Sequence, residues 1–142
     1  MKKISILCGV LLGITTHVAF ADATDISGKY SCNGKASING KKFKGEMDIQ
    51  KSSDKTTYNT TFTWSDGEKD IGSMKTTAKA NVFIQQWNSE KEPFVTGLSR
   101  WTKTKEGFIV KFFSVNQTTG DIMKGNVTCK FSKSTSNNST SD

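Results

Sequence analysis

Alternation of residue types with a period of two is the feature that most restricts what this chain can fold into. From Phe43 to Ile49 every second residue is apolar or glycine, and the run from Tyr58 to Trp64 shows a similar pattern. Such alternation places one face of a strand toward a core and the other toward solvent. No segment has an amphipathic helical pattern longer than about one turn. The sequence therefore predicts an all-β protein.

Eight runs show this alternation in strong or weak form, and short polar connectors separate them. They span 30–32, 43–49, 58–64, 71–73, 82–87, 94–104, 108–115 and 123–131. Gly72 is a candidate bulge, and the apolar residues of 82–87 leave open which face of that run is inward. Asp66-Gly67 is the strongest hairpin signal, and Asn39-Gly40 and Glu106-Gly107 also suit tight turns. Because the connections are short, consecutive strands should be antiparallel neighbours.

Residues 1–21 have the three parts of a secretory signal. Two lysines precede an apolar segment at 4–13, and Ala19-Phe20-Ala21 fits an A-x-A cleavage site. The apolar segment has about half the length needed to span a bilayer. We therefore expect a bacterial signal peptide cleaved after Ala21 and a secreted or periplasmic protein. A lipid anchor at Cys8 is the less favoured alternative.

Two cysteines, Cys32 and Cys129, would remain after this processing, because Cys8 lies in the signal segment together with His17, the only histidine. In an exported chain two cysteines predict a disulfide, here one that joins the first predicted strand to the last. A mature chain without histidine excludes a histidine-based nucleophile or general base and a histidine-ligated metal. We expect no catalytic residues, no metal site and no cofactor.

Residues 22–132 are predicted to form one domain, an antiparallel up-and-down barrel of about eight strands clamped by Cys32 and Cys129. Closing the sheet removes the unpaired edges that an open sheet would expose; a β-sandwich is the alternative. An eight-stranded barrel is either filled by side chains or holds one small ligand, and the sequence leaves both open. Residues 133–142 are almost entirely polar and predict a disordered tail.

The charged residues give few signs of a specific partner. The net charge of +7 falls to +5 without the two lysines of the signal segment, and the remaining lysines are scattered, which predicts only weak attraction to anionic surfaces. Basic residues do not cluster beside aromatic ones, so we expect no nucleic-acid binding. The strands lack the continuous apolar face of a membrane-spanning barrel. Asp66, Glu68 and Asp70 are predicted to lie together on the wet side of a charged hairpin, with Lys69 facing the other way.

The start of the predicted domain, at 26–34, resembles the first strand of the lipocalin and calycin superfamily. That strand begins with Gly-x-Trp, and this chain has Gly28-Lys29-Tyr30, with tyrosine in place of tryptophan. The length and the strand meander are also similar to those of lipocalin-like and avidin-like barrels. The resemblance implies a small apolar ligand held in the barrel interior. The candidate ligand-binding residues are aromatic side chains expected to face inward: Phe62, Trp64, Trp87, Trp101, Phe108 and Phe112.

A second resemblance is to the C-type lysozyme inhibitors, small barrels that begin with an aromatic-x-Cys and are closed by a late cysteine. Tyr30-Ser31-Cys32, Trp101-Thr102-Lys103 and Cys129 are similar in type and order to parts of that pattern. The Ser-Gly-x-x-Tyr loop of the inhibitors is missing, and Thr96-Gly97 is the nearest fragment. This resemblance implies an interaction with another protein.

Two hypotheses for function follow, and both describe an exported, non-catalytic binding protein. The first is a small apolar ligand in the barrel interior. The alternative is a protein-interaction module, such as a secreted inhibitor or a virulence-associated surface binder. Arg100, Lys103 and the 89–93 loop are the residues that this alternative would use.

Overall fold

The computed structural model describes residues 25–37 and 39–132, so the predicted signal peptide at 1–21 and the predicted tail at 133–142 lie outside the described residues. Within the described residues there is no helix long and apolar enough to cross a membrane. Eight strands make up the fold, one for each predicted run. They are β1 (Gly28–Ala36), β2 (Lys42–Lys51), β3 (Thr57–Trp64), β4 (Lys69–Thr76), β5 (Val82–Ser89), β6 (Val95–Lys103), β7 (Gly107–Asn116) and β8 (Ile122–Phe131).

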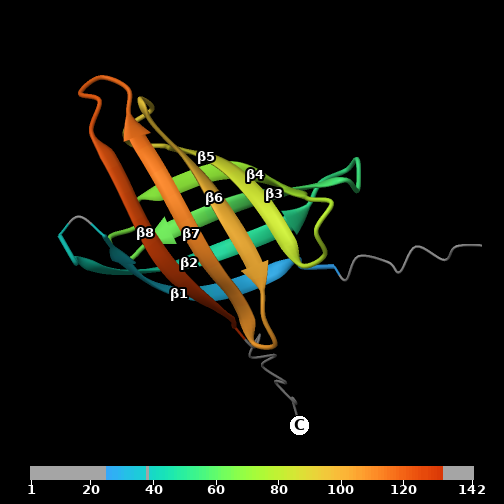
Figure 1. Ribbon diagram of the computed structural model, residues 1–142. Coiled ribbons are helices and arrows are strands. Elements are labelled where there is room, and N and C mark those ends of the chain that lie inside the picture. Colours follow the sequence, from blue (N-terminus) through green and yellow to red (C-terminus); the bar gives the residue numbers. More distant parts are fainter. Residues whose placement is uncertain (1–24, 38, 133–142) are drawn as a thin grey trace, which may run out of the picture.

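The strands form one closed antiparallel barrel, in which each strand pairs with its neighbours in the sequence and β8 returns to β1 (Figure 1). In Figure 1, β6, β7 and β8 form the near wall, and β3 and β4 lie behind them. The predicted all-β, up-and-down barrel is confirmed, and the sandwich is excluded. Pairing on both sides of β4 runs through Gly72 without an extra residue, so the bulge predicted there is absent.

A disulfide between β1 and β8 holds the closure of the barrel. Cys32 lies directly opposite Cys129 in the strand register, with Cα atoms 4.1 Å apart. The bond joins residues that are 97 positions apart in the sequence, and both side chains are buried in the core. The predicted link between the first and the last strand is therefore confirmed.

The interior is filled at the end of the barrel where the β2–β3, β4–β5 and β6–β7 connections lie, which we call the closed end. Phe108 is 1% exposed there, and its ring packs edge to face on Tyr30, Phe83 and Trp101, with centroids 5.3 to 5.9 Å apart. The Tyr30 hydroxyl donates a hydrogen bond to the carbonyl oxygen of Ile26 at 2.8 Å. Residues before β1 are thereby anchored to the core, and large side chains pack against one another at this end.

Two tight turns follow the chemistry that the sequence indicated. Gly40, in the β1–β2 connection, has a φ of 64°, and Gly67, in the β3–β4 connection, has a φ of 89°. Both values lie in the left-handed region, which glycine adopts without a steric penalty. Asp66-Gly67 therefore fixes where β3 ends and β4 begins, and this sets the inward face of β4.

Candidate ligand-binding site

A cavity enters the barrel from the opposite end, which is formed by the β1–β2, β3–β4, β5–β6 and β7–β8 connections and which we call the open end. The space open to the centre of a water molecule is about 60 Å³. At roughly 10 to 15 Å³ for each water, this is room for about five waters. The lining residues are Phe43, Met47, Phe62, Trp64, Asp70, Gln85, Trp87, Ser99, Trp101, Val110, Phe112, Met123, Val127 and Cys129.

Exposure of the lining residues falls from the mouth of the cavity to its floor. Met123 is 37% exposed, and Phe43, Trp64 and Phe112 are half-buried. The floor is formed by side chains that are 5% exposed or less, among them Trp101. The cavity is therefore closed at the bottom by the packed core and reaches solvent past three aromatic side chains and Met123.

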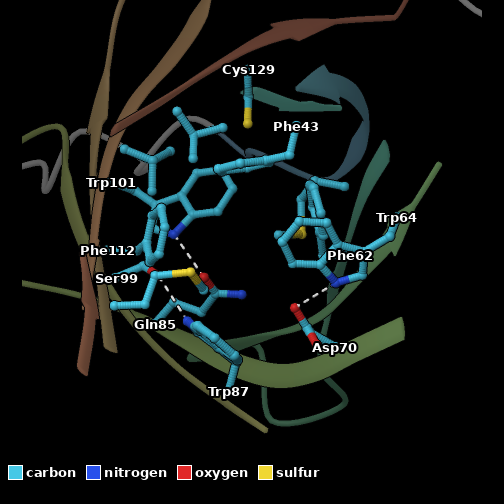
Figure 2. Close-up of a pocket in the computed structure, with 14 residues that line it drawn as sticks. Phe43, Phe62, Trp64, Asp70, Gln85, Trp87, Ser99, Trp101, Phe112 and Cys129 are labelled. Carbon is cyan, nitrogen blue, oxygen red and sulfur yellow. Dashed lines mark hydrogen bonds between the residues drawn. The ribbon is translucent and has the colours of Figure 1, made fainter. Parts of the chain in front are cut away.

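Four aromatic residues form a continuous rim at the mouth, and we call them the aromatic rim: Phe43, Phe62, Trp64 and Phe112. Ring centroids are 5.0 Å apart for Phe62 and Trp64, 5.2 Å for Trp64 and Phe43, and 5.9 Å for Phe43 and Phe112. The rings meet at steep angles, the arrangement that aromatic pairs favour. Figure 2 shows Phe62 and Trp64 on one side of the cavity and Trp101 and Phe112 on the other.

Inward-facing glycines leave the space that these rings occupy. Gly34 pairs with Phe43, Gly125 with Phe112 and Gly97 with Trp87, each on a neighbouring strand. A Cβ added to any of the three glycines would overlap the ring beside it. The rings therefore lie against the barrel wall, over backbone, and the centre of the barrel at this end stays free.

Each of the three indole N–H groups is fixed by a hydrogen bond to a different polar side chain. Trp64 donates to Asp70 Oδ2 at 2.9 Å, Trp87 to Ser99 Oγ at 2.9 Å, and Trp101 to Gln85 Oε1 at 2.8 Å (Figure 2). Gln85 is held in turn, because its Nε2 donates to the Thr60 hydroxyl at 2.9 Å. A buried tryptophan needs such a partner, and these bonds set the orientation of the cavity wall before any ligand arrives.

Asp70 is the one charged residue among those that line the cavity. It is the second residue of β4, faces inward and is 9% exposed. Burial raises the pKa of its carboxyl to about 6, and the nearby Glu68 charge adds to this effect. Hydrogen bonding by Trp64 and Ser89 opposes it. The three salt bridges among the described residues join Lys29 to Glu46, Lys91 to Glu68 and Lys130 to Glu106, and none of them includes Asp70.

Five of the six predicted ligand-binding residues line the cavity: Phe62, Trp64, Trp87, Trp101 and Phe112. The sixth, Phe108, also faces inward but lies in the packed closed end, below the cavity floor. The prediction that Asp70 lies on the wet side with Lys69 opposite is wrong, because β4 begins at Lys69 and its inward residues are Asp70, Gly72 and Met74.

Sequence reasoning missed the polar members of the site: Asp70, Gln85 and Ser99. A signal for Gln85 and Ser99 was present, since each lies two residues from an inward tryptophan on the same strand and must share its face. The described residues contain no group of three or more His, Cys, Asp or Glu that could hold a metal ion. What the site offers is an apolar space with one carboxylate.

Comparison with known proteins supports the fold and gives no family. No family model matches the sequence, and no curated protein matches it. The resemblances to lipocalins and lysozyme inhibitors therefore stay predictions. Among solved structures the chain is similar to EF1p2_mFAP2b bound to DFHBI, with a TM-score of 0.57 and 15% identity over 75% of this chain and 94% of that one. It is also similar to a redesigned beta barrel, mFAP1, bound to DFHBI, with a TM-score of 0.53 and 14% identity over 72% and 93%.

Proposed function

We propose that this protein is an exported, non-catalytic binding protein that holds one small, mainly apolar molecule in the open end of its barrel. The observation that carries the proposal is the cavity itself, which aromatic rings enclose and which has an exposed mouth. Glycines on neighbouring strands let the rings lie against the wall, and hydrogen bonds fix the three indole groups. Ligand sites are typically concave and mostly apolar, with a few fixed polar groups. Both structural neighbours are bound to DFHBI, and one of them is a redesigned beta barrel, which is consistent with this use of the fold.

The size of the cavity limits the ligand to about one aromatic ring. The space of about 60 Å³ is smaller than the roughly 150 Å³ of an engineered apolar cavity that takes up benzene, so even a single ring would reach into the open mouth. A larger molecule would have to leave part of its surface in solvent, past Phe43, Phe112 and Met123 at the mouth. We therefore expect a compact ligand of one ring or of similar volume.

Binding without turnover and export each have their own support. Asp70 is the single titratable side chain that lines the cavity, since Cys129 is held in the disulfide, whereas acid–base catalysis generally uses paired groups with separated pKa values. The signal-like segment at 1–21 and the Cys32–Cys129 bond both suit an oxidising compartment outside the cytoplasm.

Tryptophan fluorescence tests the proposal directly, because all three tryptophans of the chain line the cavity. We expect benzyl alcohol, a compact neutral ring, to change the fluorescence with a saturable binding curve. Phe112→Ala, in the aromatic rim, should weaken this binding about tenfold or more, because the variant loses one wall of the site.

Phe113→Ala is the matched control, since Phe113 is the next residue of β7, faces outward and is 39% exposed. It should bind as the wild type does. Native mass spectrometry of protein purified without unfolding gives a second readout, in which a mass excess that disappears on denaturation identifies a retained ligand. A wild type that binds neither benzyl alcohol nor any retained molecule would overturn the proposal. Binding would then have to be sought on the outer surface, at Arg100, Lys103 or the 89–93 loop.

A further inference from the structure

Two of the three indole groups in the cavity show that a carboxylate is not needed to orient a tryptophan. Ser99 accepts the N–H of Trp87, and Gln85 accepts that of Trp101. Both acceptors are neutral and lose little when they are buried with a partner. A neutral acceptor at position 70 would hold Trp64 equally well, so the negative charge of Asp70 needs another explanation.

The charge of Asp70 is costly where it lies. The residue is 9% exposed, and none of the salt bridges among residues 25–37 and 39–132 reaches it. A buried carboxylate without a cation loses hydration that the hydrogen bonds of Trp64 and Ser89 replace only in part. The raised pKa of the Asp70 carboxyl results from this loss of hydration. A positive charge placed in the cavity would restore the missing interaction.

The aromatic rim suits a positive charge as well. Phe62 and Trp64 belong to the strand that pairs with β4, and Phe62 lies opposite Asp70 in the register. Aromatic faces attract cations, and tryptophan does so most strongly. A carboxylate has several acceptor positions, and its hydrogen bonds to an ammonium group are stronger than those between neutral groups. The combination of one carboxylate with several aromatic rings therefore favours a cation over a neutral or an anionic ligand.

The connections next to Asp70 are negatively charged, as Asp70 is, although the chain as a whole is positive. The β3–β4 connection precedes β4, and the β5–β6 connection is bonded to the start of β4 by the Glu90 amide, which donates to the Lys69 carbonyl oxygen. Together the two connections contain four acidic residues and one lysine: Asp66, Glu68, Glu90, Glu92 and Lys91. Local negative charge at a cleft raises the concentration of cations there.

We propose that the ligand of the open end is a small organic cation, a compact amine whose apolar body lies against the aromatic rim while its ammonium group binds the Asp70 carboxylate. This inference rests on the proposed function and names the ligand class of that same site. Asp70 acts as the specificity-determining residue: it selects charge, and the rings select size and shape.

The test compares two probes of nearly equal size, benzylamine and benzyl alcohol, by tryptophan fluorescence at pH 8. In the wild type, benzylamine should bind about tenfold more tightly, the difference expected between a charged and a neutral hydrogen-bonded contact. In Asp70→Asn this preference should disappear, because asparagine keeps an oxygen for Trp64 but carries no charge. Asp48→Asn removes a charge from the outer face of β2 and should leave the preference unchanged.

The outcomes separate this inference from the proposed function. If benzyl alcohol binds and benzylamine binds no better, the cation specificity is wrong while the binding site stands. If the preference for benzylamine survives in Asp70→Asn, the selectivity does not come from Asp70 and the inference is also wrong. If neither probe binds the wild type, both proposals fall. Retained benzyl alcohol affinity in Asp70→Asn shows that the variant is folded and makes its result interpretable.

Discussion

Replacing Asp70 by asparagine should make the protein more stable at neutral and alkaline pH. The substitution keeps the size of the side chain and an oxygen that can accept the Trp64 hydrogen bond. It removes the negative charge of a residue that is 9% exposed and has no salt-bridge partner among the described residues. Most substitutions at buried polar positions destabilise a protein, so a gain here would be informative.

The magnitude follows from the pKa of Asp70. Burial raises it to about 6 from an ordinary value of 3.8. Because the folded state holds this proton more tightly than the unfolded state, the contribution of Asp70 to the free energy of unfolding falls as pH rises from about 4 to about 6. A pKa difference of about two corresponds to about 3 kcal/mol at most. Water that reaches the carboxylate through the open end should reduce the effect to about 1 to 2 kcal/mol.

Urea unfolding of wild type and Asp70→Asn at pH 8 and pH 4, followed by circular dichroism, measures this difference. At pH 8 the variant should be more stable by about 1 to 2 kcal/mol. At pH 4 the gain should be nearly lost, because Asp70 is protonated in the wild type. Groups that lie far from Asp70 are shared by both proteins and cancel in the comparison. A variant that is less stable at pH 8, or a difference that is equal at the two pH values, would refute the reasoning.

Two further predictions concern the barrel itself. Replacing Cys32 and Cys129 together by alanine should lower the free energy of unfolding, measured in urea, by about 4 to 5 kcal/mol, as the loop-entropy model predicts. A decrease below about 1 kcal/mol would show that strand pairing keeps the barrel closed without the disulfide. Gly97→Ala adds a methyl group where the Trp87 ring lies, so the ring should move into the cavity. The affinity for benzyl alcohol, measured by fluorescence, should then fall about tenfold or more. Thr96→Ala, the preceding residue on β6, is the control, and equal affinities in the two variants would contradict this account of the wall.

Much of the fold was predictable because period-two alternation, short connections and cysteine position are local properties of the sequence. The face of each strand was less predictable where alternation was weak. In β4 the most apolar side chain, Ile71, is 45% exposed, while the inward positions on either side hold Asp70 and Gly72. Hydrophobicity alone therefore assigned this strand to the wrong face. The turn at Asp66-Gly67 gives the right register, because β4 begins two residues after it.

The site was predictable in its aromatic members and not in its polar ones. Large rings in alternating strands are expected to face inward, and Phe62, Trp64, Trp87, Trp101 and Phe112 all do. Sequence reasoning missed Asp70 because a carboxylate in a charged hairpin is normally solvated. Its burial here depends on cross-strand pairing with Phe62 and Ser89. Such pairing is a property of the closed barrel, and no short segment of sequence contains it.

Whether an eight-stranded barrel is filled or hollow depends on which inward positions carry glycine. In this chain one end of the barrel is filled and the other end is hollow. Toward the open end the inward positions include Gly34, Gly45, Gly97 and Gly125, each beneath an aromatic ring from a neighbouring strand. Toward the closed end the inward positions hold large side chains, such as Tyr30, Tyr58, Phe83 and Phe108. A glycine lets a ring lie flat on the wall, whereas two large residues on facing strands meet in the centre and fill it. The number of aromatic residues alone could not separate the two ends. The pairing of each ring with a glycine does, and it makes one half of the barrel a packed core and leaves a cavity in the other half.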